Sequence, residues 1–100
     1  MEFLILAHDG TDDDAPARRL AARPAHLERI NEMIAAGTLL YAALLLDDTG
    51  QTTGSSLVCT FPSRADLDAW LALDPYVTGH VWQKIEVHPC KPAPAFTRKS

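Results

Sequence analysis

Six segments of this 100-residue chain carry two kinds of hydrophobic spacing, and their order constrains the fold more than any other feature. Four are short and rich in strand formers, and two carry apolar residues at helical spacing. The order is strand, helix, strand, strand, helix and strand, at residues 2–8, 24–36, 39–46, 55–61, 64–73 and 81–88. This order is typical of the ferredoxin-like α+β fold, in which both helices cover one face of a four-stranded antiparallel sheet. The length suits one domain, and we expect a single domain over residues 1–100.

The first two predicted strands are apolar on both faces, which is the pattern of strands that are covered from both sides. Residues 2–8 read EFLILAH, and residues 39–46 read LLYAALLL. Two helices can cover only one face of the sheet, and a large bare apolar face is unfavourable in water. We therefore expect a homodimer in which two sheets pack face to face, as in a dimeric α/β-barrel-like assembly.

The first predicted helix has clear signals at both ends. Pro24 suits the first helical position, where its missing N–H costs nothing, and Gly37 suits the C-terminal cap. The acidic run at residues 12–14 is expected to start a short separate helical arm, because carboxylates favour a helix N-terminus. The predicted buried stripe of the helix consists of Leu27, Ile30 and Ile34.

The second helix is expected to be capped by Ser63 and to end before Asp74-Pro75. Strand periodicity divides the last strand into two faces. One face carries Val81, Ile85 and Val87, and the other carries Trp82, Lys84, Glu86 and His88. Residues 91–100 are rich in proline, so we expect an extended tail that is flexible or contacts a partner.

Charge and hydropathy exclude several classes of partner. The formal net charge is -4 and the basic residues are scattered, which argues against nucleic acid. No apolar stretch approaches the ~20 residues of a membrane helix, and no signal peptide precedes the first strand. We expect a cytoplasmic protein with reduced thiols. Cys59 is expected to fill the core, and a disulfide or a catalytic thiol remains the alternative for Cys59 and Cys90.

The histidine and carboxylate residues do not have the spacing of a known metal site. Possible ligand types occur at His8, Asp9, His26, His80 and His88. We expect no metal ion and no cofactor, with metal binding kept as a minor alternative.

His26 and Asp74 are the candidate catalytic pair. His26, Ile30 and Met33 share one edge of the predicted helix, beside its buried stripe. Near a helix N-terminus the dipole disfavours imidazolium, which would keep His26 neutral, as a base requires. Asp74 is expected to cap the turn that Pro75 begins, and the end of the second helix can approach His26. The alternative is a half-buried histidine with no catalytic role and a carboxylate that serves only as a cap.

Three stretches of this chain together resemble the YciI-like (YCII-related) family of small α+β proteins. They are RPAHLERI…AAGTLLYAA, GSSLVCTF and DPYVTGHVW…VHPCK, and the resemblance covers roughly residues 3–91. It implies a ferredoxin-like fold, a dimer and a His-Asp active site, which falls on His26 and Asp74. It further implies a pocket lined by Ser55, with Arg23 and Tyr76 as substrate-binding neighbours. The chain has Ala43-Leu44 where relatives often carry Gly-Pro, which points to a different substrate.

We therefore expect a small-molecule enzyme in which a His-Asp dyad transfers a proton. The resemblance implies elimination or hydrolysis of a small phenolic or carbonyl compound, since one relative is a dehydrochlorinase of a chlorinated hydroxyquinol. Arg23 is expected to hold an anionic group of the substrate. A covalent Ser55-His26-Asp74 triad is a weaker alternative, because no nucleophile elbow is present. The alternative from another functional class is a non-catalytic module that binds a small ligand or accompanies an enzyme.

Overall fold

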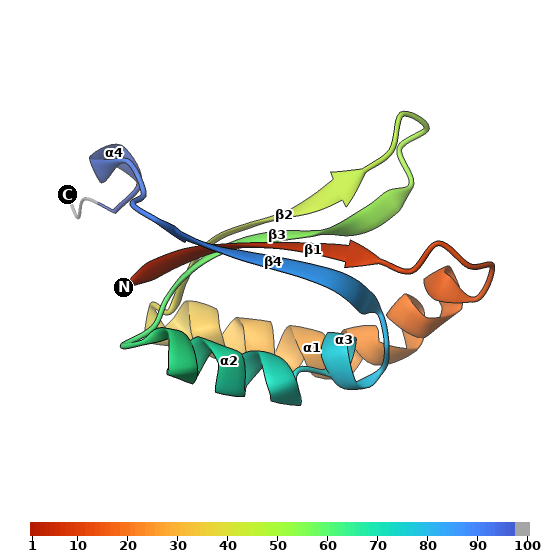
Figure 1. Ribbon diagram of the computed structural model, residues 1–100, viewed down its shortest axis with the longest axis horizontal. Coiled ribbons are helices and arrows are strands. Elements are labelled where there is room, and N and C mark those ends of the chain that lie inside the picture. The colour runs from red at the N-terminus through yellow and green to blue at the C-terminus, as the bar shows by residue number, and fades with distance from the viewer. Residues whose placement is uncertain (98–100) are drawn as a thin grey trace.

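The structure is a computed structural model that describes residues 1–97. Its elements are β1 (Glu2–Asp9), α1 (Ala15–Ala36), β2 (Leu39–Leu46), β3 (Thr52–Thr60), α2 (Arg64–Leu73), α3 (Pro75–Thr78), β4 (Trp82–Cys90) and α4 (Pro94–Thr97). The four strands form one antiparallel sheet in the order β2-β3-β1-β4. Helices α1, α2 and α3 lie against the same face of this sheet (Figure 1). The predicted ferredoxin-like βαββαβ architecture is therefore confirmed.

The core lies between the sheet and the helix layer. Alternate residues of β1, which are Phe3, Ile5 and Ala7, are buried there, as strand periodicity requires. They pack with buried residues of the other elements, which include Ile30, Met33, Leu57, Cys59, Leu67 and Leu71. Cys59 is fully buried, which confirms its predicted place in the core. Both cysteines are free thiols.

Helix α1 begins earlier than predicted. It runs without interruption from Ala15, so residues 12–14 do not start a separate arm and Pro24 lies inside the helix. Pro16 occupies the early helical position that was expected for Pro24. An interior proline removes one hydrogen bond to the carbonyl group four residues earlier. That carbonyl belongs to Leu20, whose side chain is 72% exposed, so water can reach this side of the helix.

The buried stripe of α1 also differs from the prediction. His26, Ile30 and Met33 are buried, whereas Leu27 is 37% exposed and Ile34 is 57% exposed. The reason is that α1 packs against α3 as well as against the sheet. This second contact turns the face that carries His26 toward the interior.

A β-bulge changes the direction of one aromatic side chain. Pairing between β1 and β4 shifts between His8 and Asp9, which face Lys84 and Trp82 respectively, so Gln83 is the extra residue. Beyond the bulge the alternation of β4 is reversed. Trp82, predicted to share a face with Lys84, is instead buried against the helix layer.

The predicted caps are present. Gly37 ends α1 with a φ of 76°, which is the left-handed conformation that glycine adopts readily. The Ser63 hydroxyl accepts a hydrogen bond from the backbone N–H of Asp66 at the start of α2. Asp74 caps α3 by accepting from the backbone N–H of Tyr76 at 3.0 Å.

The opposite face of the sheet is not covered by α1, α2 or α3 (Figure 1). Leu4, Leu6 and Val58 are only half-buried there. The tail is not extended throughout as expected, because residues 94–97 form the short helix α4, which starts at a proline. The rest of the predicted tail, residues 98–100, lies outside the described residues. Among residues 1–97, no helix has the length and apolar character needed to cross a membrane.

Candidate active site

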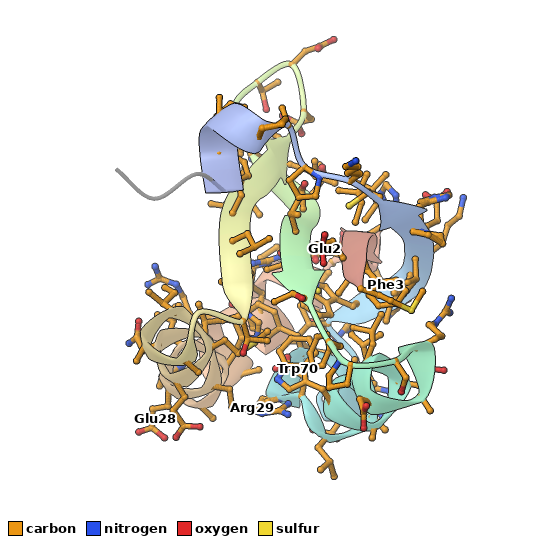
Figure 2. All side chains as sticks on the ribbon, turned by 90° about the vertical axis from the view of Figure 1, so that its left-hand side faces the viewer. Glu2, Phe3, Glu28, Arg29 and Trp70 are labelled. Carbon is orange, nitrogen blue, oxygen red and sulfur yellow. The ribbon has the colours of Figure 1, made fainter. Side chains whose placement is uncertain are left out.

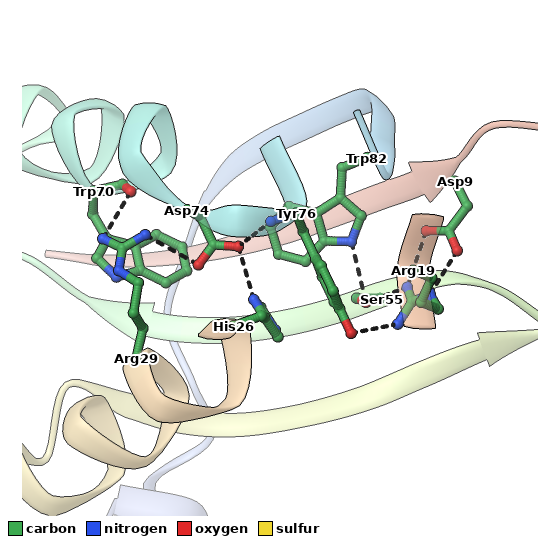
Figure 3. Close-up of polar contacts among 9 residues, drawn as sticks. All are labelled: Asp9, Arg19, His26, Arg29, Ser55, Trp70, Asp74, Tyr76 and Trp82. Carbon is green, nitrogen blue, oxygen red and sulfur yellow. Dashed lines mark hydrogen bonds and ion pairs between the residues drawn. The ribbon is translucent and has the colours of Figure 1, made fainter. Parts of the chain in front are cut away.

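His26 and Asp74 meet in the interior, 48 positions apart in sequence. The Nδ1 atom of His26 lies 2.7 Å from Oδ2 of Asp74, and both side chains are buried (Figure 3). A carboxylate accepts hydrogen bonds, so Nδ1 carries the hydrogen and donates it. The neutral ring then has its lone pair on Nε2. The expected contact between these two residues is confirmed.

Arg29 balances the buried carboxylate of Asp74, and its role was not foreseen from the sequence. Its guanidinium donates to Oδ1 of Asp74 at 3.1 Å and to the backbone carbonyl of Trp70 at 3.1 Å. It also lies over the Trp70 ring, 4.9 Å from the centroid. Figure 2 shows Arg29 and Trp70 side by side between the helices, while Glu28 points outward. The carboxylate therefore has a cationic partner even when the imidazole is neutral.

This arrangement replaces the predicted dipole effect. His26 lies well inside α1, which begins at Ala15, so its ring is not near the helix N-terminus. The dipole effect falls off within the first turn and does not act at this position. The Arg29–Asp74 ion pair is instead the feature that makes a neutral His26 compatible with a buried carboxylate.

Two aromatic rings fix the plane of the imidazole. The Tyr76 ring stacks on His26 with centroids 3.8 Å apart and an interplanar angle of 11°. Trp82 meets the same imidazole edge-on at 5.4 Å. Together with the Asp74 hydrogen bond, these contacts leave His26 little freedom to turn.

The Nε2 atom of His26 faces a cavity. Nε2 has no hydrogen-bond partner among residues 1–97. Every fully buried side-chain nitrogen or oxygen atom in that range does have a partner, so Nε2 is not fully buried. Nε2 must therefore touch accessible space. The cavity that His26 lines has a volume of about 420 Å³. This arrangement leaves a base-competent nitrogen open to a small molecule.

The cavity brings together most of the predicted site residues. Arg23, Ser55 and Tyr76 line it with His26, whereas Asp74 lies behind the imidazole. Its apolar wall includes Leu27, Ile30, Ala42, Leu44 and Leu57. Leu44, from the Ala43-Leu44 pair that the sequence analysis singled out, is part of this wall.

Arg23 is the cationic group most free to meet a ligand. Its side chain is exposed, lines the cavity and makes no ion pair with any residue in positions 1–97. The Ser55-His26-Asp74 triad is not formed, because the described residues contain no hydrogen bond between Ser55 and His26. Ser55 instead contacts Arg19 and Trp82.

In the sequence analysis Arg19 was missed altogether, and Asp9 was named only as a possible metal ligand. The guanidinium of Arg19 holds both carboxylate oxygens of Asp9, at 2.6 and 2.9 Å, and lines the cavity. It also donates to the Ser55 hydroxyl at 3.0 Å. The signal was the helical spacing of Arg19, Arg23 and His26, which is visible only when α1 starts before Arg19.

Burial and charge shift two titratable groups at the cavity. Burial lowers the pKa of Arg19, but the hydrogen bonds and charge of Asp9 outweigh it, so the pKa lies above its ordinary value. Burial raises the pKa of the Tyr76 phenol, although the charges of Arg19 and Arg23 oppose that shift. Tyr76 is therefore a neutral hydroxyl at physiological pH. Within residues 1–97, no cluster of three or more His, Cys, Asp or Glu side chains is placed to bind a metal ion.

Comparison with known sequences gives consistent matches over nearly the whole chain. The profile of the YCII-related domain matches residues 1–91. Two relatives, each called Protein YciI, come from Escherichia coli and Shigella flexneri and are 36% identical over 97 residues. An uncharacterized protein of Haemophilus influenzae is 32% identical over 97 residues. Each alignment covers 91% of this chain and 97% of the relative.

Comparison with solved structures confirms the fold. The structure is similar to 5-chloro-2-hydroxyhydroquinone dehydrochlorinase from Burkholderia phenoliruptrix, in complex with 2,5-dihydroxybenzoquinone. The TM-score is 0.79 at 21% identity, and the match covers 95% of this chain and 98% of the other. An antibiotic biosynthesis monooxygenase matches with a TM-score of 0.51 at 17% identity, over 94% of this chain and 100% of the other. At these identities the likenesses show a shared fold.

Proposed function

The chain belongs to the YCII-related domain family, and from that premise we propose that it is a small-molecule enzyme whose catalytic dyad is His26 and Asp74. The observation that carries this proposal is the geometry of one imidazole. Nδ1 of His26 is held by a buried carboxylate, and Nε2 opens to a cavity. A base with one nitrogen oriented and the other accessible is the arrangement that general acid–base catalysis requires.

The proposed reaction is an elimination. The Nε2 atom of His26 takes a proton from an acidic C–H or O–H group of the substrate. The electron pair of that bond moves into the substrate as a new double bond, and the leaving group departs with its own bonding pair. Asp74 stabilises the imidazolium that forms and keeps the ring in position. In a hydrolysis, the same nitrogen would take the proton of the attacking water.

The substrate class follows from the cavity and from the solved neighbour. A volume of about 420 Å³ with a largely apolar wall fits a single-ring compound. Arg23 would hold an anionic group of that compound. The structural neighbour acts on a chlorinated trihydroxybenzene and binds a dihydroxyquinone, so we propose a small phenolic or carbonyl compound for this chain.

Chloride release from 5-chloro-2-hydroxyhydroquinone and a set of other chlorinated phenols tests the proposal. The natural protein should release chloride, and His26→Ala should abolish turnover while its circular dichroism spectrum is unchanged. Turnover retained in His26→Ala would remove the dyad mechanism. Saturable binding of 2,5-dihydroxybenzoquinone without any turnover would instead favour a non-catalytic ligand-binding or accessory module.

The open face of the sheet supports a second part of the proposal, a homodimer. Half-buried apolar side chains at Leu4, Leu6 and Val58 lie on the face that the main helices leave uncovered. A second copy with the same face would cover them. Sedimentation should give a dimer mass for the natural protein and a monomer mass for Leu6→Lys. Leu20→Lys, an exposed change on the helix layer, should stay dimeric, and an unchanged mass for Leu6→Lys would refute this interface.

A further inference from the structure

The hydroxyl of Ser55 is surrounded by donors. The Arg19 guanidinium donates to its oxygen at 3.0 Å, and the indole N–H of Trp82 donates to the same oxygen at 3.3 Å (Figure 3). Neither of these groups can accept a hydrogen bond. A serine oxygen has two lone pairs, and both are occupied. The Ser55 hydrogen must therefore point elsewhere, and it has no acceptor among residues 1–97.

The hydroxyl of Tyr76 is in a similar position. Arg19 approaches its oxygen from the same guanidinium, with an N–O distance of 3.5 Å, and lies 4.8 Å from the ring centroid. The Tyr76 hydroxyl also has no acceptor in the described part of the chain. Ser55 and Tyr76 both line the cavity. The cavity is therefore the place where two buried hydroxyl hydrogens can find an acceptor.

Arg19 is fixed firmly enough to impose this direction. Both carboxylate oxygens of Asp9 hold its guanidinium, and the Asp9 side chain is 8% exposed. A cation that donates to a hydroxyl oxygen also polarises the O–H bond and strengthens it as a donor. Asp9, Arg19 and Trp82 thus act on the hydroxyls without needing to touch a ligand.

We propose that the Ser55 and Tyr76 hydroxyls form a binding site for a negatively charged oxygen. Arg19, which donates to both hydroxyl oxygens, and Trp82, which donates to that of Ser55, are the positioning residues that keep the hydroxyls as donors. This inference rests on the proposed function and assigns a substrate class to the same cavity. The substrate carries an oxygen on which negative charge develops when His26 removes the proton, as in a phenol, an enol or an enolisable carbonyl. The proton goes to Nε2 of His26. In a phenol or an enol the O–H bonding pair stays on the oxygen, whereas in a carbonyl compound the C–H pair forms a C=C bond and the π pair of the C=O bond moves to the oxygen. In each case the two hydroxyls stabilise the negative charge on that oxygen.

A pair of probes tests this site without turnover. 4-Nitrophenolate carries the charged oxygen, and nitrobenzene has the same ring without it. We expect the natural protein to bind 4-nitrophenolate more tightly than nitrobenzene. Ser55→Ala and Tyr76→Phe should each weaken phenolate binding roughly ten- to hundredfold, because each removes a hydrogen bond to a charged group. Nitrobenzene binding should stay nearly unchanged, which shows that the cavity is intact.

The positioning role of Trp82 needs its own measurement. Trp82→Phe keeps an aromatic ring but removes the indole N–H, so the Ser55 hydroxyl can reorient. We expect phenolate binding to weaken roughly two- to tenfold. The pKa of bound 4-nitrophenol, read from its phenolate absorbance, should lie below the free value in the natural protein and rise in this variant. Thr53→Val removes an exposed hydroxyl of the same strand and should change neither quantity.

Each outcome separates the two proposals. Equal affinity of the natural protein for both probes, or no binding of either, would overturn the oxygen-binding site. So would phenolate binding that survives both Ser55→Ala and Tyr76→Phe. A phenolate preference that remains in His26→Gln, together with no turnover by the natural protein, would refute the enzyme proposal and leave this site standing.

Discussion

Replacing Asp74 by asparagine should cost about 2 kcal/mol of unfolding free energy. The carboxylate is fully buried and accepts three hydrogen bonds, from His26, from Arg29 and from the backbone of Tyr76. Asparagine offers one oxygen, which we expect to keep the two partners at Oδ2. Its amide group then faces Arg29, so one hydrogen bond between charged groups is lost, worth about 1.5–3 kcal/mol. Arg29 is partly exposed, so water relieves part of that loss.

Asp74→Ala removes all three hydrogen bonds and should cost about 4 kcal/mol, within the range for breaking a buried ion pair. The loss of the α3 cap contributes about 1 kcal/mol of this. Asp68→Asn is the matched control, because Asp68 also pairs with an arginine, Arg64, at 2.9 Å but is 57% exposed. It should cost less than about 0.5 kcal/mol.

Urea unfolding of the three variants, at one protein concentration, measures these costs. The urea midpoint should be highest for Asp68→Asn, lower for Asp74→Asn and lowest for Asp74→Ala, with little change in the slope m. Equal midpoints for the two Asp74 variants would refute the assignment of two partners to one oxygen. A cost for Asp74→Asn as small as that for Asp68→Asn would refute the ion-pair reasoning altogether.

Three further predictions concern other residues. Burial raises the pKa of the Tyr76 phenol in the folded chain, so the unfolded chain loses this proton at a lower pH than the folded chain does. The free energy of unfolding, measured in urea, should therefore fall as the pH rises above about 10, and a value that is flat from pH 9 to 11 would contradict this. Burial raises the pKa of the Cys59 thiol to about 11, so iodoacetamide at pH 8 should alkylate Cys90 and spare Cys59 until urea is added, as read by peptide mass spectrometry. Gly54→Ala should lower the free energy of unfolding, measured in urea, by about 1–3 kcal/mol, because its Cβ would collide with the backbone carbonyl oxygen of Ala7; unchanged stability would show that β1 can move aside.

The order of elements and the main dyad could be predicted from the sequence, because both depend on local signals. Apolar periodicity gave the six segments, and Asp74-Pro75 marked a cap that brings a carboxylate to the end of α2. The beginning of α1 could not be predicted in the same way. A proline is a strong start signal, and only the tertiary structure shows that the helix continues through Pro24.

The Ser55 network was beyond the reach of periodicity for the same reason. Arg19 enters the site only because α1 extends past Pro24 toward the N-terminus. Trp82 enters only because the bulge at Gln83 reverses the alternation of β4, and one extra residue in a strand leaves no mark in the amino-acid pattern. Both residues reach Ser55 through irregularities of the backbone.

The unbroken helix α1 also fixes the distance between Arg19 and His26, two residues that line the cavity. Arg19 and His26 are seven positions apart in this helix, so their Cα atoms are separated by about 10.5 Å along the helix axis. No loop lies between them whose length could vary, and one inserted residue would turn Arg19 by about 100° away from the cavity. Relatives that accept larger molecules would therefore have to gain room on the opposite wall, where Ala42 and Leu44 of β2 lie.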